Sequence, residues 1–103
     1  MKILCVCNQG NNRSVQFAHI LKYWKHDTIP IGIDTTTKET LKILYKWADV
    51  IICTDETQVI PAEYQKKYRL WNVGPDIYPR PFNKELRAKA TTFLEENKDW
   101  LKN

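Results

Sequence analysis

The chain has 103 residues and a net charge of +4 at pH 7, with 43% hydrophobic and 27% charged residues. This length allows one moderate core, so we expect a single domain over residues 1–103. The basic excess favours anionic substrates, but the chain lacks a run of five Lys or Arg residues, and we expect no nucleic-acid partner. No apolar stretch approaches the ~18 residues of a membrane span.

The three cysteines have neither the density of a disulfide scaffold nor the spacing of metal ligands. They favour a reducing, cytoplasmic setting, and no secretory signal is recognisable. We therefore expect no membrane association, no metal and no cofactor.

The first half of the chain predicts strands and helices in alternation. Residues 2–7 form an apolar run typical of a buried strand. Residues 29–33 form a second apolar stretch, whose proline indicates an edge strand. Thr36 and Glu39 have the spacing of a capping box and predict the start of a helix. Between these strands, residues 14–25 place apolar side chains at helical spacing: Phe17, Ile20, Leu21 and Trp24.

The second half continues the alternation. Residues 49–54 predict the next strand, because Val50, Ile51 and Ile52 are contiguous and β-branched, as in a parallel strand buried on both faces. Asp55 and Gln58 have the spacing of a helix cap, which we favour, with a helix to follow. Asp55 would also lie at a strand end, where it could instead order the loop after the first strand. Residues 68–73 predict a fourth strand, and Asn83 begins a long amphipathic helix.

This order predicts an α/β fold with three layers: a four-stranded parallel sheet and helices on both faces. We expect the flavodoxin-like strand order 2-1-3-4. Ligand sites in such sheets lie beyond the carboxyl ends of the strands, beside strand one. The functional site is therefore expected where the first strand ends, at Cys7.

A cysteine, five intervening residues, an arginine and a serine follow the first strand: Cys7, Arg13 and Ser14. Backbone N–H groups in a compact loop before a helix can surround the oxygens of a phosphoryl group. Arg13 would add planar, bidentate donation, and Ser14 could donate its hydroxyl to the Cys7 sulfur. We expect these donors to hold Cys7 as a thiolate. An isolated cysteine here would be a core residue, as we expect for Cys5 and Cys53.

Residues 7–14 resemble the phosphate-binding loop of the low-molecular-weight protein tyrosine phosphatases. Residues 47–56 resemble the third strand of that family with its acidic turn, and residues 73–79 resemble the loop that carries its general acid. The resemblance implies that Cys7 is the nucleophile and Asp76 the general acid, although Asp76 also fits ordinary turn chemistry. It implies Arg13 as a further catalytic residue and, as substrate-binding residues, Asn8, Gln9, Gly10, Asn11, Asn12, Ser14 and Tyr78.

The loop departs from the family pattern at three positions. Gln9 stands where the family usually has glycine, Gly10 where it has asparagine, and Asn12 where it has a second cysteine. Gly10 still allows a tight loop. The chain is also short between the second and third strands, where the family carries part of its pocket rim, so substrate specificity transfers poorly.

The resulting hypothesis is a phosphomonoester hydrolase that acts through a phosphocysteine, on phosphotyrosine in proteins or on small phosphomonoesters. One alternative is a cysteine phosphocarrier domain, which would need neither Arg13 nor a distal acid. Another is an arsenate reductase, whose disulfide relay needs further accessible cysteines. The last is a phosphate- or phosphoprotein-binding module of the same fold with weakened turnover.

Overall fold

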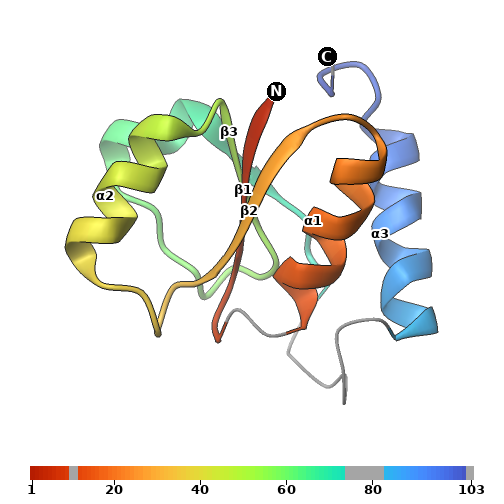
Figure 1. The fold of residues 1–103 in the computed structure, drawn as a ribbon, viewed down its shortest axis with the longest axis horizontal. Helices are drawn as coiled ribbons and strands as arrows, with labels where there is room; N and C mark the ends of the chain where they lie inside the picture. Colours follow the sequence, from red (N-terminus) through yellow and green to blue (C-terminus); the bar gives the residue numbers. More distant parts are fainter. Residues whose placement is uncertain (10–11, 74–82, 102–103) are drawn as a thin grey trace.

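The computed structural model describes residues 1–9, 12–73 and 83–101 (Figure 1). Its elements in chain order are β1 (Lys2–Cys7), α1 (Arg13–Tyr23), β2 (Asp27–Gly32), α2 (Lys38–Trp47), β3 (Val50–Cys53), the 3-10 helix η1 (Ala62–Lys67), β4 (Tyr68–Leu70) and α3 (Lys84–Glu96). The four strands form one parallel sheet in the order β2-β1-β3-β4. The predicted α/β class, parallel pairing and strand order are confirmed.

Helices cover both faces of the sheet (Figure 1): α1 and α3 lie on one face, and α2 lies on the other with η1. The strand β1 is one of the two inner strands and pairs with β2 from Lys2 to Cys7 and with β3 from Ile3 to Val6. Because both faces are covered, all side chains of β1 after Lys2 are buried. This is the burial expected of a parallel strand between two helical layers.

Two apolar clusters hold these layers together, one on each face of the sheet. Toward α1 and α3, Phe17 stacks on Trp71 with 4.4 Å between ring centroids, and Phe93 meets Phe17 edge-on at 5.5 Å. Toward α2 and η1, the rings of Tyr45 and Tyr64 lie 5.3 Å apart. Each large apolar side chain that is fully buried contributes ~1.5–3 kcal/mol, so the two clusters fix the helices on the sheet.

Two helix ends differ from the sequence prediction. Thr37, not Thr36, caps α2, because the Thr36 hydroxyl instead donates to the Gly32 carbonyl at the end of β2, at 2.7 Å. The helix α1 ends at Tyr23, before the predicted residue 25. Lys25 has a φ of 73°, the left-handed conformation that commonly follows a helix end.

The helix expected directly after Asp55 does not form. Residues 54–61 make a turn and then irregular chain, and only the short helix η1 follows, with Pro61 as its N-cap. Proline disfavours helical backbone in the residue before it, so a helix cannot run through this point. The strand β4 is also shorter than predicted, although the Trp71 N–H still donates to the Cys53 carbonyl at 2.8 Å.

Candidate active site

The candidate site lies at the carboxyl ends of the strands, at the lower edge of the sheet in Figure 1. Cys7 is the last residue of β1, and Arg13 is the first residue of α1. Beyond the strand, the Ile33 N–H donates to the Cys7 carbonyl at 2.8 Å, and the Asp34 N–H donates to the Asn8 carbonyl at 2.9 Å. The pairing between β1 and the chain after β2 therefore continues into the loop and fixes its first residues.

The Cys7 sulfur lies 3.0 Å from the Ser14 hydroxyl oxygen, so the contact expected between these side chains is present. Both residues are at most 1% exposed. Ser14 belongs to the first turn of α1, and a helix N-terminus carries partial positive charge. Either atom can be the donor in the contact between Cys7 and Ser14, and the contact lies at this positive end of α1.

The other two cysteines have core environments. Cys5 is fully buried in the cluster that faces α1 and α3, and Cys53 is fully buried in the opposite cluster. Burial, with a smaller contribution from the Asp55 charge, raises the pKa of Cys53 to about 12. Burial likewise raises the pKa of Cys5. Both thiols therefore stay neutral near pH 7, and the expectation that they belong to the core agrees with their burial.

Arg13 is 1% exposed. Its Nη1 donates to Asp55 Oδ2 at 2.6 Å, and its Nη2 donates to Asn8 Oδ1 at 3.4 Å. A guanidinium has five N–H donors in a planar fork, a geometry that matches carboxylate and phosphate oxygens. The Asp55 carboxylate thus fixes the orientation of this fork at the start of α1.

Asp55 connects the turn after β3 to the start of α1. One carboxylate oxygen accepts from the Thr57 N–H at 2.8 Å and from the Thr57 hydroxyl, and the other accepts from Arg13. Burial by itself would raise the pKa of Asp55, but the hydrogen bonds from Thr57 and Arg13 outweigh it and hold the pKa below its ordinary value. The favoured helix-cap interpretation was wrong, since Asp55 closes a turn and orders the loop after the first strand.

Gln58 also reaches the loop, a role that its spacing from Asp55 did not predict. Its Nε2 donates to Asn8 Oδ1 at 2.6 Å, and its Oε1 accepts from the Thr54 N–H at 2.7 Å. The side chain is buried. One turn, residues 54–58, therefore holds both ends of the loop, with Asn8 bound to Gln58 and Arg13 bound to Asp55.

Two further glutamines, Gln9 in the loop and Gln16 in α1, differ in their burial. Gln16, in the first turns of α1, is 1% exposed, and neither its Oε1 nor its Nε2 has a hydrogen-bond partner within the described residues. The helical pattern of apolar residues gave no sign of this buried amide. Gln9 is exposed, and its carbonyl accepts from the Thr35 hydroxyl at 3.3 Å. The chain after β2 therefore forms one side of the loop's rim.

Of the remaining predicted site residues, the structure describes only Asn12. Asn12 is the N-cap of α1, where its carbonyl accepts from the Gln16 N–H at 3.0 Å. Gly10, Asn11, Asp76 and Tyr78 lie outside the described residues. The structure thus brings together Cys7, Asn8, Arg13 and Ser14, and the roles of Asp76 and Tyr78 remain predictions.

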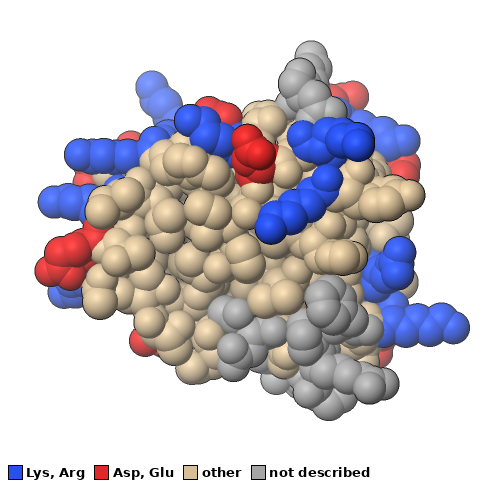
Figure 2. All heavy atoms as spheres, viewed as in Figure 1, with Lys and Arg blue, Asp and Glu red and all other residues tan. Residues whose placement is uncertain are grey.

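Charged side chains are unevenly placed on the face shown in Figure 2. Among the described residues, Lys and Arg gather toward the upper edge and the flanks of this view. Arg13 and the N-terminus of α1 contribute positive charge at the site.

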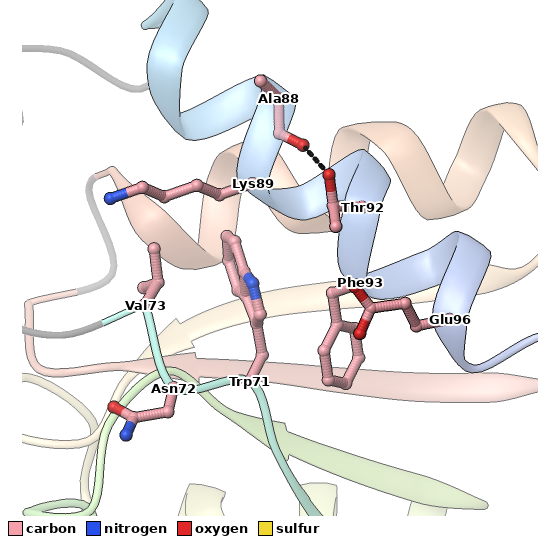
Figure 3. A pocket seen from close by; sticks show the side chains of 8 residues that line it. All are labelled: Trp71, Asn72, Val73, Ala88, Lys89, Thr92, Phe93 and Glu96. Carbon is pink, nitrogen blue, oxygen red and sulfur yellow. Dashed lines mark hydrogen bonds between the residues drawn. The ribbon is translucent and has the colours of Figure 1, made fainter.

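A cavity of about 400 Å³ opens between α3 and the chain after β4 (Figure 3). The rings of Trp71 and Phe93 form its apolar wall, and Lys89 and Glu96 stand at its rim. The Val73 N–H, at the end of this wall, donates to the Thr54 carbonyl at 3.1 Å. The cavity and the loop-holding turn are therefore joined by a direct backbone hydrogen bond.

Comparison with protein-family models, with curated proteins and with solved structures finds no match to this chain. Membership in the phosphatase family that residues 7–14 resemble therefore remains a proposal, argued from residues and geometry. In the described parts of the chain, no group of three or more His, Cys, Asp or Glu could hold a metal ion. Within the same residues, no helix is long and apolar enough to cross a membrane.

Proposed function

We propose that this protein hydrolyses phosphomonoesters in two steps through a phosphocysteine at Cys7. The observation that carries the proposal is the contact of 3.0 Å between the Cys7 sulfur and the Ser14 hydroxyl, at the start of the helix that Arg13 opens. A nucleophile, a donor to that nucleophile and an arginine fork thus meet at one helix N-terminus, which is a favourable place for an anion.

In the first step, the Cys7 thiolate attacks phosphorus, and the bond from phosphorus to the leaving oxygen breaks. Asp76 is the proposed acid that gives this oxygen its proton. Arg13 and the loop N–H groups hold the equatorial oxygens while negative charge spreads over them. The product of this step is a phosphocysteine and a free alcohol or phenol.

In the second step, water attacks the phosphocysteine, and the bond from sulfur to phosphorus breaks. Asp76, now a carboxylate, accepts the proton of the attacking water. The sulfur leaves as a thiolate, which accepts a hydrogen bond from the Ser14 hydroxyl. Inorganic phosphate is released, and the enzyme returns to its starting state.

The class of substrate follows from this chemistry and from the family resemblance. A phosphorylated tyrosine or a small aryl phosphomonoester presents a dianion of the right shape and a phenol that leaves readily. Partner proteins would therefore be phosphoproteins recognised through the phosphoryl group. A cytoplasmic setting is also part of the proposal, because a catalytic thiolate needs reducing conditions.

The test is an assay with p-nitrophenyl phosphate under reducing conditions. We expect turnover in the wild type, its loss in Cys7→Ser, and a fall of about 10²–10⁴-fold in Asp76→Ala. Cys53→Ser is the matched control, because it removes a core thiol instead of the proposed nucleophile. A wild type without turnover that depends on Cys7 would refute the hydrolase. A stable phosphocysteine formed from a donor protein, without hydrolysis, would support the phosphocarrier alternative instead.

A further inference from the structure

We propose that Gln58 is a positioning residue of this site, whose buried amide keeps the Asn8 side-chain oxygen from closing further on Arg13, to which it is bonded at 3.4 Å. The inference rests on the proposed function, because the reaction that Gln58 would affect is the proposed hydrolysis. Asn8 follows Cys7 directly, so the position of its side chain affects the first part of the phosphate loop. The observation that supports the proposal is a pair of hydrogen bonds, each of 2.6 Å, between the loop and the turn at residues 54–58. Arg13 donates to Asp55, and Gln58 donates to Asn8. Asp55 holds one end of the loop, and Gln58 holds the other.

The Gln58 amide is fixed in one orientation. Its Oε1 accepts from the backbone N–H groups of Thr54, at 2.7 Å, and of Asp55, at 3.3 Å. Its Nε2 donates to Asn8 Oδ1 at 2.6 Å and to the Thr54 hydroxyl at 2.9 Å. Turning the amide over would set its NH₂ group against two N–H donors and its oxygen against the Asn8 oxygen. Gln58, which is 2% exposed, therefore presents a fixed donor to Asn8.

Asn8 is the residue through which this donor acts. Its backbone carbonyl is held by the Asp34 N–H at 2.9 Å. Its side-chain oxygen accepts from Gln58 at 2.6 Å and from Arg13 Nη2 at the longer distance of 3.4 Å. The shorter bond is the stronger one, so the oxygen is held on the Gln58 side. Without that donor, the same oxygen would move toward the guanidinium and compete with a phosphoryl group for its N–H groups.

This competition matters most in the transition state. Donors that are already in place when charge spreads over the phosphoryl oxygens stabilise the transition state, and a displacement of about 1 Å can lower turnover about 10²-fold. We expect Gln58→Met to lower kcat for p-nitrophenyl phosphate about 10–100-fold and to change KM less than about threefold. A side chain that only fills space would not produce this split between kcat and KM.

A double-mutant cycle with Asn8→Ala tests whether Gln58 acts through Asn8. If it does, adding Asn8→Ala to Gln58→Met removes the competing oxygen, and the double variant recovers part of the kcat that Gln58→Met alone loses. If Gln58 only satisfies the buried N–H groups of Thr54 and Asp55, Asn8→Ala does not raise the kcat of Gln58→Met, and the proposal is overturned. Gln58→Glu keeps an oxygen that accepts from those buried donors and removes only the donor to Asn8, so it takes the place of Gln58→Met if that variant does not fold.

Gln65→Met is the matched control. Gln65 also uses its Nε2 in a short hydrogen bond, to the Ile60 carbonyl at 2.7 Å, but it lies in η1, and among the described residues its side chain forms no hydrogen bond to the loop. Its substitution should lower stability and leave kcat within about twofold of the wild type, as expected for substitutions outside the site. A similar loss of kcat in Gln65→Met and Gln58→Met would overturn the positioning role.

A second readout separates this proposal from the proposed function. Orthovanadate resembles the transition state of phosphoryl transfer and inorganic phosphate resembles the ground state, and both can protect Cys7 from alkylation by iodoacetamide. We expect Gln58→Met to need about 10–100-fold more vanadate for half protection, with little change for phosphate. If the wild type is protected but has no turnover, the hydrolase fails and the positioning role stands. Equal protection in wild type and variant, or a wild type that neither ligand protects, overturns the positioning role.

Discussion

Arg13 and Asp55 lie 42 positions apart in the sequence and form an ion pair of 2.6 Å between Nη1 and Oδ2. The Arg13 side chain is 2% exposed and the Asp55 side chain 13%. This pair joins the start of α1 to the turn after β3. A buried ion pair adds little net stability, because both charges lose water, but removing one partner leaves the other charge buried without that partner. The pair therefore makes the candidate site sensitive to single substitutions.

Asp55→Ala should destabilise the protein strongly. The substitution leaves the buried Arg13 charge without this carboxylate, and breaking a buried pair in this way typically costs ~3–5 kcal/mol. A small domain has a free energy of unfolding of only ~5–15 kcal/mol, so the effect is readily seen in urea titrations. Glu56→Ala, at the exposed next position, is the control and should change stability by less than ~0.5 kcal/mol. Equal losses in the two variants would contradict this account of the pair.

The same pair should make stability depend on pH in the acid range. Hydrogen bonds from Thr57 and Arg13 hold the pKa of Asp55 below its ordinary value of 3.8, although burial acts in the opposite direction. A carboxyl whose pKa is lowered by folding contributes stability above its unfolded pKa and loses it as the pH falls through its folded pKa. The advantage of wild type over Asp55→Asn in the free energy of unfolding should therefore shrink below pH 3.8. An advantage that stays constant between about pH 5 and about pH 3 would be inconsistent with this linkage.

The strands of the sheet could be predicted from the sequence because local patterns of apolar residues mark them. Contiguous apolar residues in β1 and β3 require burial on both faces, which is the condition of a central parallel strand. The contact between Cys7 and Ser14 also follows from a local feature, the short loop between a strand and a helix. These parts of the prediction needed no knowledge of distant partners.

The long-range hydrogen bonds of the site could not be predicted in the same way. The Asp55 and Gln58 spacing is that of a capping box, and part of its bonding is present, because Gln58 Oε1 accepts from the Asp55 N–H. Pro61 nevertheless prevents a helix from continuing. The side chains bind Arg13 and Asn8 instead, because β3 pairs beside β1 and brings the turn next to the loop. Partners so far apart in the sequence are set by strand register, which no local pattern encodes.

Gln16→Met should stabilise the protein. The Gln16 amide is buried and has no hydrogen-bond partner within the described residues, and an unsatisfied buried polar group costs ~1–3 kcal/mol. Methionine keeps a similar length without polar N–H or C=O groups, so we expect a gain of about 1 kcal/mol, or a rise in Tm of about 4–8 °C. Gln65→Met should have the opposite sign, because the Gln65 amide donates to the Ile60 carbonyl. A loss of stability in Gln16→Met would show that its amide has a favourable interaction in solution.

Ser14→Ala should slow the proposed second step more than the first. When the sulfur leaves phosphorus, its negative charge is stabilised by the Ser14 hydroxyl at 3.0 Å, and a hydrogen bond to a charged group contributes ~1.5–3 kcal/mol. Its loss corresponds to a fall of about 10–150-fold in the rate of phosphocysteine hydrolysis. Rapid mixing with p-nitrophenyl phosphate should then show a burst of one nitrophenolate per enzyme, because the intermediate accumulates. Thr28→Val is the control, since it removes another buried hydroxyl, bonded to the Ala18 carbonyl at 3.1 Å and remote from the sulfur. A burst in both variants, or in neither, would show that the Ser14 hydroxyl has no specific role in the second step.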